Sequence, residues 1–331
     1  MRNAAGKPNM NPVVHGGDLG AASRRHPHAP LPWLDLSTGI NPHAYPIGIV
    51  GNDAWARLPG RQEEAALISA AGRRYGVSEY ECLVAAPGTQ ALIQLLPRLV
   101  PTSRVAVIGP TYEEHEVAWR RLGHEVRVVA DLGGASDADV IVVVNPDNPT
   151  GRLIPARDLP APKTLLVVDE AFIDFLPPAA SLAGALPPRT IVLRSFGKTY
   201  GLGGLRLGFA IAQPDLAARL REELGPWAVS GPALAIGRTA LSDDAWLQAT
   251  KERLETDGRR LDEVLGAAGC RAVGGTHLFR LVAHESAAAI AERLGACGIH
   301  VRTFPRQPQW LRFGLPGSTR DFERLAQALG V

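Results

Sequence analysis

Apolar residues between positions 105 and 193 occur in short continuous runs. The strongest run is 140–144, which consists of five β-branched residues in a row. Runs without polar alternation are typical of strands in a sheet that is covered on both faces. The strands predicted here are 105–108, 125–129, 140–144, 165–168 and 191–193.

Helical patterns alternate with these runs and dominate after residue 213. Apolar residues three or four positions apart predict helices. The predicted helices are 61–76, 114–122, 214–223, 232–242, 245–268, 286–295 and 319–329, and Ser318 is a candidate N-cap for the last. Short strands are predicted near 277–282 and 310–314. Strands that alternate with helices predict an α/β fold with a mainly parallel sheet.

The pattern divides the chain into three parts. Residues 1–45 are rich in His, Pro, Asn and Gly and are expected to form an irregular arm, packed against the small domain and the active site. Residues 46–240 are expected to form a large ligand-binding domain, and 241–331 a smaller α+β domain. The boundary between the two domains is expected within 225–250.

Composition excludes several classes of function. The 331 residues carry 35 Lys+Arg and 33 Asp+Glu, a net charge of +2, which does not support nucleic-acid binding through bulk positive charge. Cys82, Cys270 and Cys297 are too widely spaced to indicate a disulfide framework or a zinc site, so we expect no metal and a reducing compartment. The chain has no apolar segment typical of a secretory signal or a membrane span. We therefore expect a cytoplasmic protein.

Polar segments follow the predicted strands, at the edge where open α/β sheets bind ligands. Lys198 lies between Gly197 and Gly201, after an apolar strand. It is either an ordinary surface lysine or an amine that forms a Schiff base with an aldehyde cofactor. Asp169 directly follows the strand 165–168. It is either a turn cap or the partner of a protonated pyridine nitrogen.

A phosphate site is predicted where Gly88, Thr89 and Gln90 precede the apolar helical run 91–99. Two further residues, Ser195 and Arg206, would add a hydroxyl group and a fixed cation. Tyr112 could lie against a flat ring, or it could be a core residue.

The joint order of three motifs is specific: NPDNPTG at 145–151, DEAF at 169–172 and SFGKTYGLGGLRLG at 195–208. With them, the chain resembles the fold-type I, aspartate-aminotransferase-like superfamily of pyridoxal-phosphate enzymes, from about residue 35 to the C-terminus. The resemblance implies that fold and pyridoxal 5'-phosphate as cofactor.

The resemblance also implies roles for individual residues. Lys198 would be the Schiff-base lysine, Asp169 would pair with the pyridine nitrogen, and Tyr112 would stack on the ring. Asn148 would bind the ring hydroxyl, and Arg312, within WLRFG at 310–314, would bind the substrate carboxylate. The phosphate would be held by Thr89, Ser195 and Arg206, with Gly88 and Gln90 beside them.

The DEAF and KTYGL motifs resemble those of histidinol-phosphate aminotransferases. The HGG element at 15–17 and the DLSTGINP element at 35–42 resemble those of L-threonine-O-3-phosphate decarboxylases of cobalamin biosynthesis. The implied reaction is decarboxylation of a phosphorylated amino acid, L-threonine O-3-phosphate, to (R)-1-amino-2-propanol O-2-phosphate, and the alternative is the aminotransferase reaction. The implied substrate-binding residues are His15, Gly16, Asn41, Asn148 and Arg312.

One position departs from the aminotransferase pattern. Many histidinol-phosphate aminotransferases carry a YPD-like triplet whose tyrosine reaches the cofactor phosphate of the other subunit. This chain has Leu58 in the stretch RLPG at 57–60, and leucine cannot donate that hydrogen bond. This weakens the aminotransferase alternative and leaves the cross-subunit contact open. A homodimer is still what the family resemblance implies.

Overall fold

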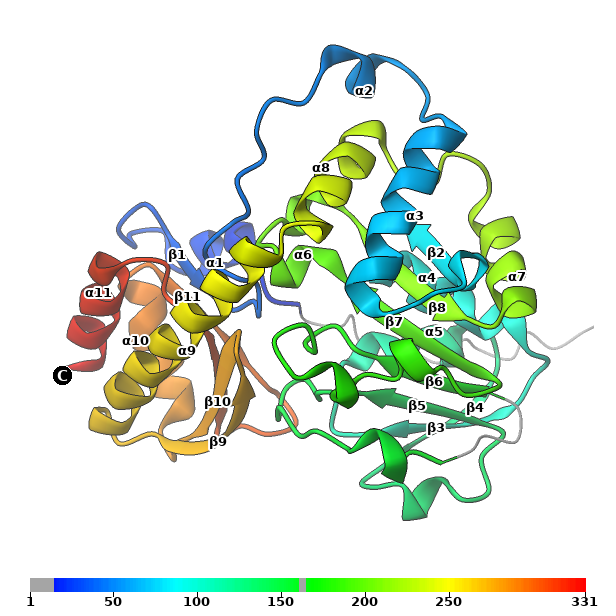
Figure 1. Cartoon of the computed structure of the whole chain (residues 1–331). Coiled ribbons are helices and arrows are strands. Elements are labelled where there is room, and N and C mark those ends of the chain that lie inside the picture. Colours follow the sequence, from blue (N-terminus) through cyan, green and yellow to red (C-terminus); the bar gives the residue numbers. More distant parts are fainter. Residues whose placement is uncertain (1–14, 161–164) are drawn as a thin grey trace, which may run out of the picture.

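The computed structural model describes residues 15–160 and 165–331. They form a larger part, which contains strands β2 to β8, and a smaller part, which contains β9 to β12 and ends at the C-terminus (Figure 1). The predicted helices are present, each within one residue of its predicted ends. Ser318 caps the last helix, since its hydroxyl accepts a hydrogen bond from the backbone N–H of Asp321.

Within the described residues, the larger part contains a seven-stranded sheet of order β2-β8-β7-β6-β5-β3-β4. The strands are β2 (Leu83–Ala86), β3 (Arg104–Ile108), β4 (Glu125–Val129), β5 (Val140–Val144), β6 (Leu165–Asp169), β7 (Thr190–Ser195) and β8 (Gly208–Ala212). Strands β3 to β7 are parallel, as predicted, whereas β8 runs antiparallel to both of its neighbours.

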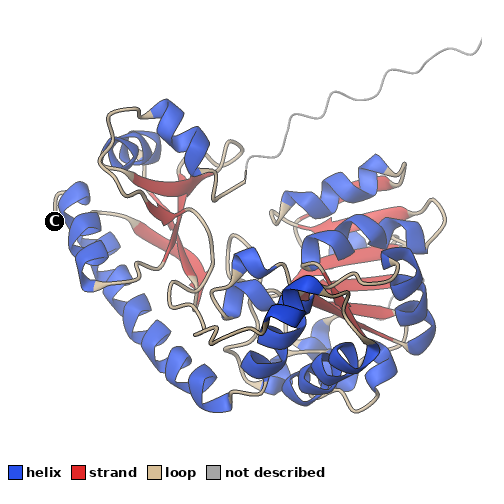
Figure 2. Cartoon of the chain, turned by 90° about the horizontal axis from the view of Figure 1, so that it is seen from above, coloured by secondary structure: helices blue, strands red, loops and turns tan. Residues whose placement is uncertain are grey.

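Both faces of this sheet are covered by helices (Figure 2). Alternate residues of each strand belong to two separate cores; in β5, Ile141 and Val143 belong to one, and Val140 and Val142 to the other. One core includes residues of α3 (Arg61–Tyr75) and α8 (Gly231–Leu241). The other is covered by α4 (Thr89–Leu95), α5 (Glu113–Arg121) and α7 (Pro214–Leu224). This arrangement explains why the strands are apolar at consecutive positions.

The reversed strand β8 brings its first residue to the carboxyl-terminal edge of the sheet. Gly208 pairs with Ser195, the last residue of β7, and with Ala86, the last residue of β2. Residues that precede β8 therefore lie at the same edge as residues that follow the parallel strands. Neither β2 nor β8 was among the predicted strands.

The smaller part contains a five-stranded sheet of order β1-β11-β12-β10-β9 in the described residues. Its strands are β1 (Leu34–Leu36), β9 (Arg271–Thr276), β10 (Phe279–Ala283), β11 (Ile299–Thr303) and β12 (Trp310–Gly314). Helices α9 (Asp244–Ala267), α10 (Ala287–Ala296) and α11 (Thr319–Leu329) pack on it around a third core.

The N-terminal segment is more regular than the irregular arm that the sequence predicted. It contains α1 (Leu19–Arg25), and β1 pairs in parallel with β11 of the smaller part. A segment with α2 (Asn52–Ala56) then leads to the larger part. Short 3-10 helices lie at Tyr80–Cys82, Leu96–Leu99, Gly133–Ala135, Ala156–Asp158, Pro178–Ala180, Ala183–Ala185 and Gly203–Leu205.

The two parts meet through a close backbone contact. A Cβ atom at Gly151, which has φ +72°, would lie 2.0 Å from the carbonyl oxygen of Gly275 on β9. Only glycine fits such an approach, which accounts for the last residue of the NPDNPTG motif. In the described parts of the chain, no helix is long and apolar enough to cross a membrane.

Candidate active site

A cavity of about 340 Å³ lies at the carboxyl-terminal edge of the larger sheet, between the two parts. We call it the inner cavity. It is lined by almost every residue that the sequence predicted for the site: His15, Gly16, Gly88, Thr89, Gln90, Tyr112, Asn148, Asp169, Ser195, Lys198, Arg206 and Arg312. The exception is Asn41.

Asp169 ends β6 and is held in a fixed orientation. Its Oδ2 lies 3.0 Å from Nε2 of His115, and its Oδ1 accepts a hydrogen bond of 3.1 Å from the backbone N–H of Ala171. Both side chains are buried. A buried carboxylate needs such partners, and the sequence analysis did not identify His115 as one of them. The sequence offered one signal for His115: it lies three residues after Tyr112, near the start of a predicted helix.

Lys198 lies in a short helix, α6 (Phe196–Thr199), which directly follows β7. Burial lowers the pKa of its amine, Asp169 opposes this shift, and the cations Arg312 and Arg206 add to it. A lowered pKa increases the fraction of neutral, nucleophilic amine.

Asn41 supports Lys198 from outside the cavity. Its backbone N–H donates to the carbonyl of Lys198, and its Nδ2 donates to the carbonyl of Thr199 at 2.8 Å. Its Oδ1 accepts from the backbone N–H of His43. Both ends of the carboxamide therefore have a partner within the protein, which gives Asn41 a structural role beside Lys198; its substrate contact stays a prediction from the sequence.

The predicted phosphate site is a cradle of backbone and side-chain donors. Gly88 has φ +83°, and a Cβ atom there would lie 2.7 Å from Nη2 of Arg206. A Cβ at Gly208 would lie 2.7 Å from the backbone nitrogen of Thr89. Gly88 therefore lets the guanidinium group approach the start of α4, and Gly208 lets the start of β8 do so. The N–H groups and positive charge at a helix N-terminus favour an anion.

Tyr112 is fixed by a chain of hydrogen bonds. Its hydroxyl donates to Oε1 of Gln90 at 3.1 Å, and Nε2 of Gln90 donates to Oε2 of Glu114 at 2.7 Å. Burial, with the carboxylates of Glu114 and Asp169, raises the pKa of Tyr112 to about 12, so the phenol stays protonated. Glu114 also contacts Nε2 of His15 at 3.0 Å, which fastens the N-terminal arm beside the cavity.

Arg312, on β12, contacts the larger part and the arm at once. Its guanidinium donates to Oδ1 of Asn148, and its Nη2 donates to the carbonyl of Ser37 at 2.7 Å. Ser37 in turn accepts from the backbone N–H of Gly17 through its hydroxyl oxygen. Burial, and next the positive charge of Arg302, lower the pKa of Arg312 to about 9.

A second cavity of about 380 Å³, the outer cavity, adjoins the first. The two share His15, Gly16, Tyr112, Asn148 and Arg312 in their linings. Arg302 lines the outer cavity and is directly opposite Arg312 in the register of β11 and β12. Sequence analysis missed Arg302, because β11 was not among the predicted strands.

Each of these two arginines has one guanidinium N–H group without an acceptor in the part of the chain that the structure describes. Nη1 of Arg302 and Nε of Arg312 are buried, and neither has a hydrogen-bond partner among the described residues. Like charges directly opposite in a sheet repel each other, and unpaired buried donors cost free energy. An anionic ligand in the outer cavity would offset the repulsion between the two charges.

The fold and the order of the site residues define a known class. The chain belongs to the aminotransferase class I and II family, whose model matches residues 52–329. It is 44% identical to a threonine-phosphate decarboxylase from Sinorhizobium sp, over 96% of this chain and 98% of that protein. It is 41% identical to the threonine-phosphate decarboxylase of Pseudomonas aeruginosa, over 96% of this chain and 97% of that protein.

Solved structures share the same fold. The histidinol-phosphate aminotransferase of Sinorhizobium meliloti, solved with pyridoxal-5'-phosphate, superimposes with a TM-score of 0.82 and 24% identity, over 99% of this chain and 97% of that one. Histidinol-phosphate aminotransferases are more distant in sequence; one is 34% identical over 75% of this chain. The predicted family and fold are therefore confirmed.

Proposed function

We propose that this protein is a pyridoxal-phosphate-dependent decarboxylase that converts L-threonine O-3-phosphate to (R)-1-amino-2-propanol O-2-phosphate and CO2. The 44% identity to a threonine-phosphate decarboxylase over nearly the whole of both chains supports this assignment. The observation that carries it is the pair of directly opposed guanidinium groups, Arg302 and Arg312, at the outer cavity, because the substrate has two anionic groups to place.

The residues of the inner cavity fit the cofactor. The cradle consists of Gly88, Thr89, Ser195 and Arg206, and it supplies hydrogen-bond donors and one cation for a phosphate. It also leaves open the space that a Cβ atom at Gly88 would fill. Asp169 supplies a fixed carboxylate for the protonated ring nitrogen. Tyr112 would lie against the ring. The Nδ2 group of Asn148 remains for the ring hydroxyl, since its Oδ1 accepts from Arg312.

The two arginines would divide the substrate's anions between them. Arg312 touches both cavities and hydrogen-bonds Asn148, so we assign it to the carboxylate, as the sequence resemblance implies. Arg302 lies only in the outer cavity, so we assign it to the substrate phosphate. A guanidinium group binds either oxyanion through two parallel hydrogen bonds.

When bound, the cofactor draws the electron pair of a broken Cα bond into its ring. The protein selects the bond that breaks by fixing the carboxylate with Arg312 while Arg302 holds the phosphate at the other end. The Cα–carboxylate bond breaks, CO2 leaves, and a proton must be returned to Cα. Lys198 is the donor, since its amine lines the inner cavity beside Asp169.

A second copy of the chain is the partner that we propose. The segment before α3 exposes large apolar side chains, of which Ile49 is 103% and Trp55 66% exposed, and Leu58 is also exposed. Such surfaces are typical of protein interfaces. The homodimer and any cross-subunit contact near Leu58, like the cytoplasmic location and the place in cobalamin biosynthesis, stay predictions from the sequence.

The test is CO2 release from L-threonine O-3-phosphate by purified holoenzyme without an oxo-acid acceptor. We expect many turnovers per site, because a decarboxylase regenerates its cofactor in each cycle. An aminotransferase would stall after one half-reaction. Absence of CO2, together with conversion of histidinol phosphate when 2-oxoglutarate is added, would contradict the proposal and favour the histidinol-phosphate aminotransferase reaction.

A further inference from the structure

Three residues of the inner cavity each have a chain neighbour in one buried polar cluster behind the site. Asp169, Ser195 and Lys198 line the cavity. Their neighbours are Glu170, Arg194 and Thr199, none of which lines it. Successive residues of a strand point to opposite sides of the sheet, and successive residues of a helix point about 100° apart. Each of these three pairs therefore places one residue at the inner cavity and the other in the cluster.

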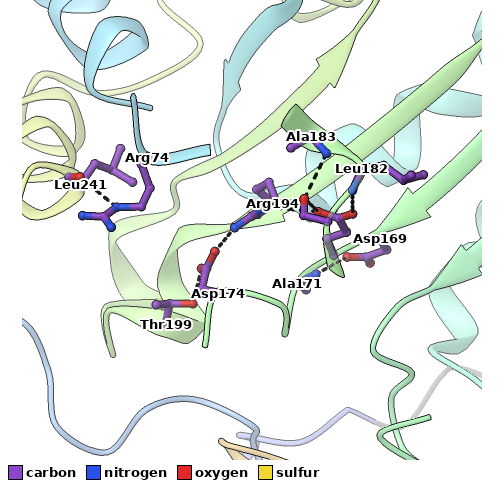
Figure 3. Close-up of polar contacts among 11 residues, drawn as sticks. Arg74, Asp169, Ala171, Asp174, Leu182, Ala183, Arg194, Thr199 and Leu241 are labelled. Atoms are coloured by element: carbon purple, nitrogen blue, oxygen red, sulfur yellow. Dashed lines mark hydrogen bonds and ion pairs between the residues drawn. The ribbon is translucent and has the colours of Figure 1, made fainter. Parts of the chain in front are cut away.

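We call the residues Glu170, Asp174, Ser181, Arg194 and Thr199 the Arg194 cluster. Nη1 of Arg194 lies 3.3 Å from Oε2 of Glu170 and donates to the hydroxyl of Ser181 at 3.2 Å. Its Nη2 donates to one carboxylate oxygen of Asp174, and the hydroxyl of Thr199 donates to the other (Figure 3). Arg194 therefore joins the strand end at Asp169 to the helix that carries Lys198.

The cluster places the Arg194 guanidinium between two carboxylates, while its Nε has no hydrogen-bond partner in the described residues. Burial alone would lower the pKa of Arg194, but the carboxylates of Asp174 and Glu170 outweigh burial and raise that pKa. The guanidinium group also lies over the ring of Tyr75, 4.3 Å from its centroid. A buried charge with several partners has few alternative positions, so the groups attached to it are held firmly.

Thr199 is the link between this cluster and Lys198. Its hydroxyl is tied to Asp174, and its carbonyl accepts from Nδ2 of Asn41 on the opposite side. The carbonyl of Lys198 accepts from the backbone N–H of the same Asn41. The backbone around Lys198 is therefore fastened from two directions, by the arm and by the Arg194 cluster.

We propose that Thr199, anchored by Asp174 and Arg194, is a positioning residue that fixes where the Lys198 amine stands in the inner cavity. This inference rests on the proposed role of Lys198 toward the cofactor. It goes beyond that role because it assigns a function to a polar cluster that lines neither the inner nor the outer cavity. Small displacements of a reacting group reduce rates strongly, so a hydroxyl remote from the substrate affects the chemical step.

The Thr199 hydroxyl offers the least disruptive test. Replacing Arg194 would leave two buried carboxylates unpaired and could prevent folding. Thr199→Val keeps the shape and removes only the hydrogen bond to Asp174, whereas Thr199→Ser keeps the hydroxyl. Thr256→Val is the matched control, since Thr256 is exposed on α9 and its hydroxyl donates to a carbonyl of its own helix.

Two measurements on the holoenzymes test the proposal. The first is the pH midpoint at which the visible absorption band of the bound cofactor changes, which requires no substrate. We expect T199V to shift this midpoint by about half a pH unit or more, because Lys198 would move relative to Asp169, Arg206 and Arg312. The second is steady-state kinetics with L-threonine O-3-phosphate. We expect kcat to fall roughly tenfold or more in T199V, with KM and cofactor content nearly unchanged.

T199S and T256V should match the wild type in both measurements. The proposal is overturned if T199V also matches the wild type in both, or if T199S loses as much as T199V, since the methyl group and not the hydroxyl would then matter. Should T199V not fold, T199A carries the same expectation. If the wild type releases no CO2, the proposed function fails, but the absorption midpoint still decides the role of Thr199.

Discussion

The inner and outer cavities differ in how their charged groups are satisfied. In the inner cavity, both oxygens of Asp169 have partners supplied by the chain, His115 and the backbone of Ala171. In the outer cavity, Arg302 lies directly opposite Arg312, which lines both cavities, and each retains a buried N–H group with no acceptor in the described structure. A carboxylate with partners in the protein keeps its place with or without a ligand, whereas two opposed like charges are stabilised when an anionic ligand arrives. The inner cavity is thus suited to a resident cofactor and the outer cavity to a substrate that comes and goes.

The largest loss of activity is expected from a substitution in the inner cavity. Replacing Lys198 by alanine removes both the amine that anchors the cofactor and the proposed proton donor. We expect CO2 release to fall by roughly a thousandfold or more, with loss of the visible band of the bound cofactor. Lys251→Ala, on α9, is the control and should retain activity. An unchanged band in K198A would refute the assignment of Lys198.

The next largest effect should separate the two arginines of the outer region. A hydrogen bond to a charged group contributes about 1.5–3 kcal/mol, so R302Q and R312Q should each raise KM for L-threonine O-3-phosphate by roughly tenfold to a hundredfold. Competition by L-threonine, which lacks the phosphate, distinguishes them. R312Q should weaken the binding of L-threonine, whereas R302Q should not. If R302Q weakened both ligands equally, the assignment of Arg302 to the phosphate would be wrong.

A smaller loss, in cofactor affinity, is expected when Asp169 loses one of its hydrogen-bond partners. His115→Leu removes the donor to Oδ2 and leaves only the backbone N–H of Ala171. We expect the dissociation constant of the cofactor to rise roughly tenfold, the lower end of what a hydrogen bond to a charged group contributes. His115→Gln, whose amide can donate in its place, should recover most of the affinity. Equal affinity in H115L and the wild type would mean that His115 does not hold Asp169 for the cofactor.

The sequence predicted the core of the larger part well because the responsible patterns are local. Strand β5 is β-branched throughout, and every predicted helix had a repeat of apolar positions. Three of the missed strands, β1, β2 and β8, carried weaker signals. β2 and β8 are short and rich in Ala or Gly, and β1 has only three residues and exists because β11 pairs with it. Strands of that kind depend on tertiary partners, which a single sequence does not reveal.

The site shows the same division between local motifs and distant contacts. Residues next to predicted strand ends, such as Asp169 and Lys198, line the inner cavity as the topology requires. Asn41 belongs to a motif, but it does not line the inner cavity, and its carboxamide bonds to Thr199 and His43, which depends on how the arm folds back. Arg302 could have been found as a polar position alternating with Ile299 and Val301, had β11 been recognised. The roles of the individual site residues stay predictions until they are tested.

The reversed strand β8 also has a consequence for folding. The phosphate cradle takes Thr89 from after β2, Ser195 from the end of β7 and Arg206 from before β8, so it exists only when strands from residue 83 to residue 212 are assembled. A cofactor that binds this cradle binds the folded chain alone, and each tenfold increase of free cofactor above its dissociation constant adds about 1.4 kcal/mol to the free energy of unfolding. The supply of cofactor in the cell therefore sets how much of this enzyme persists in the folded state, as well as how much of it is active.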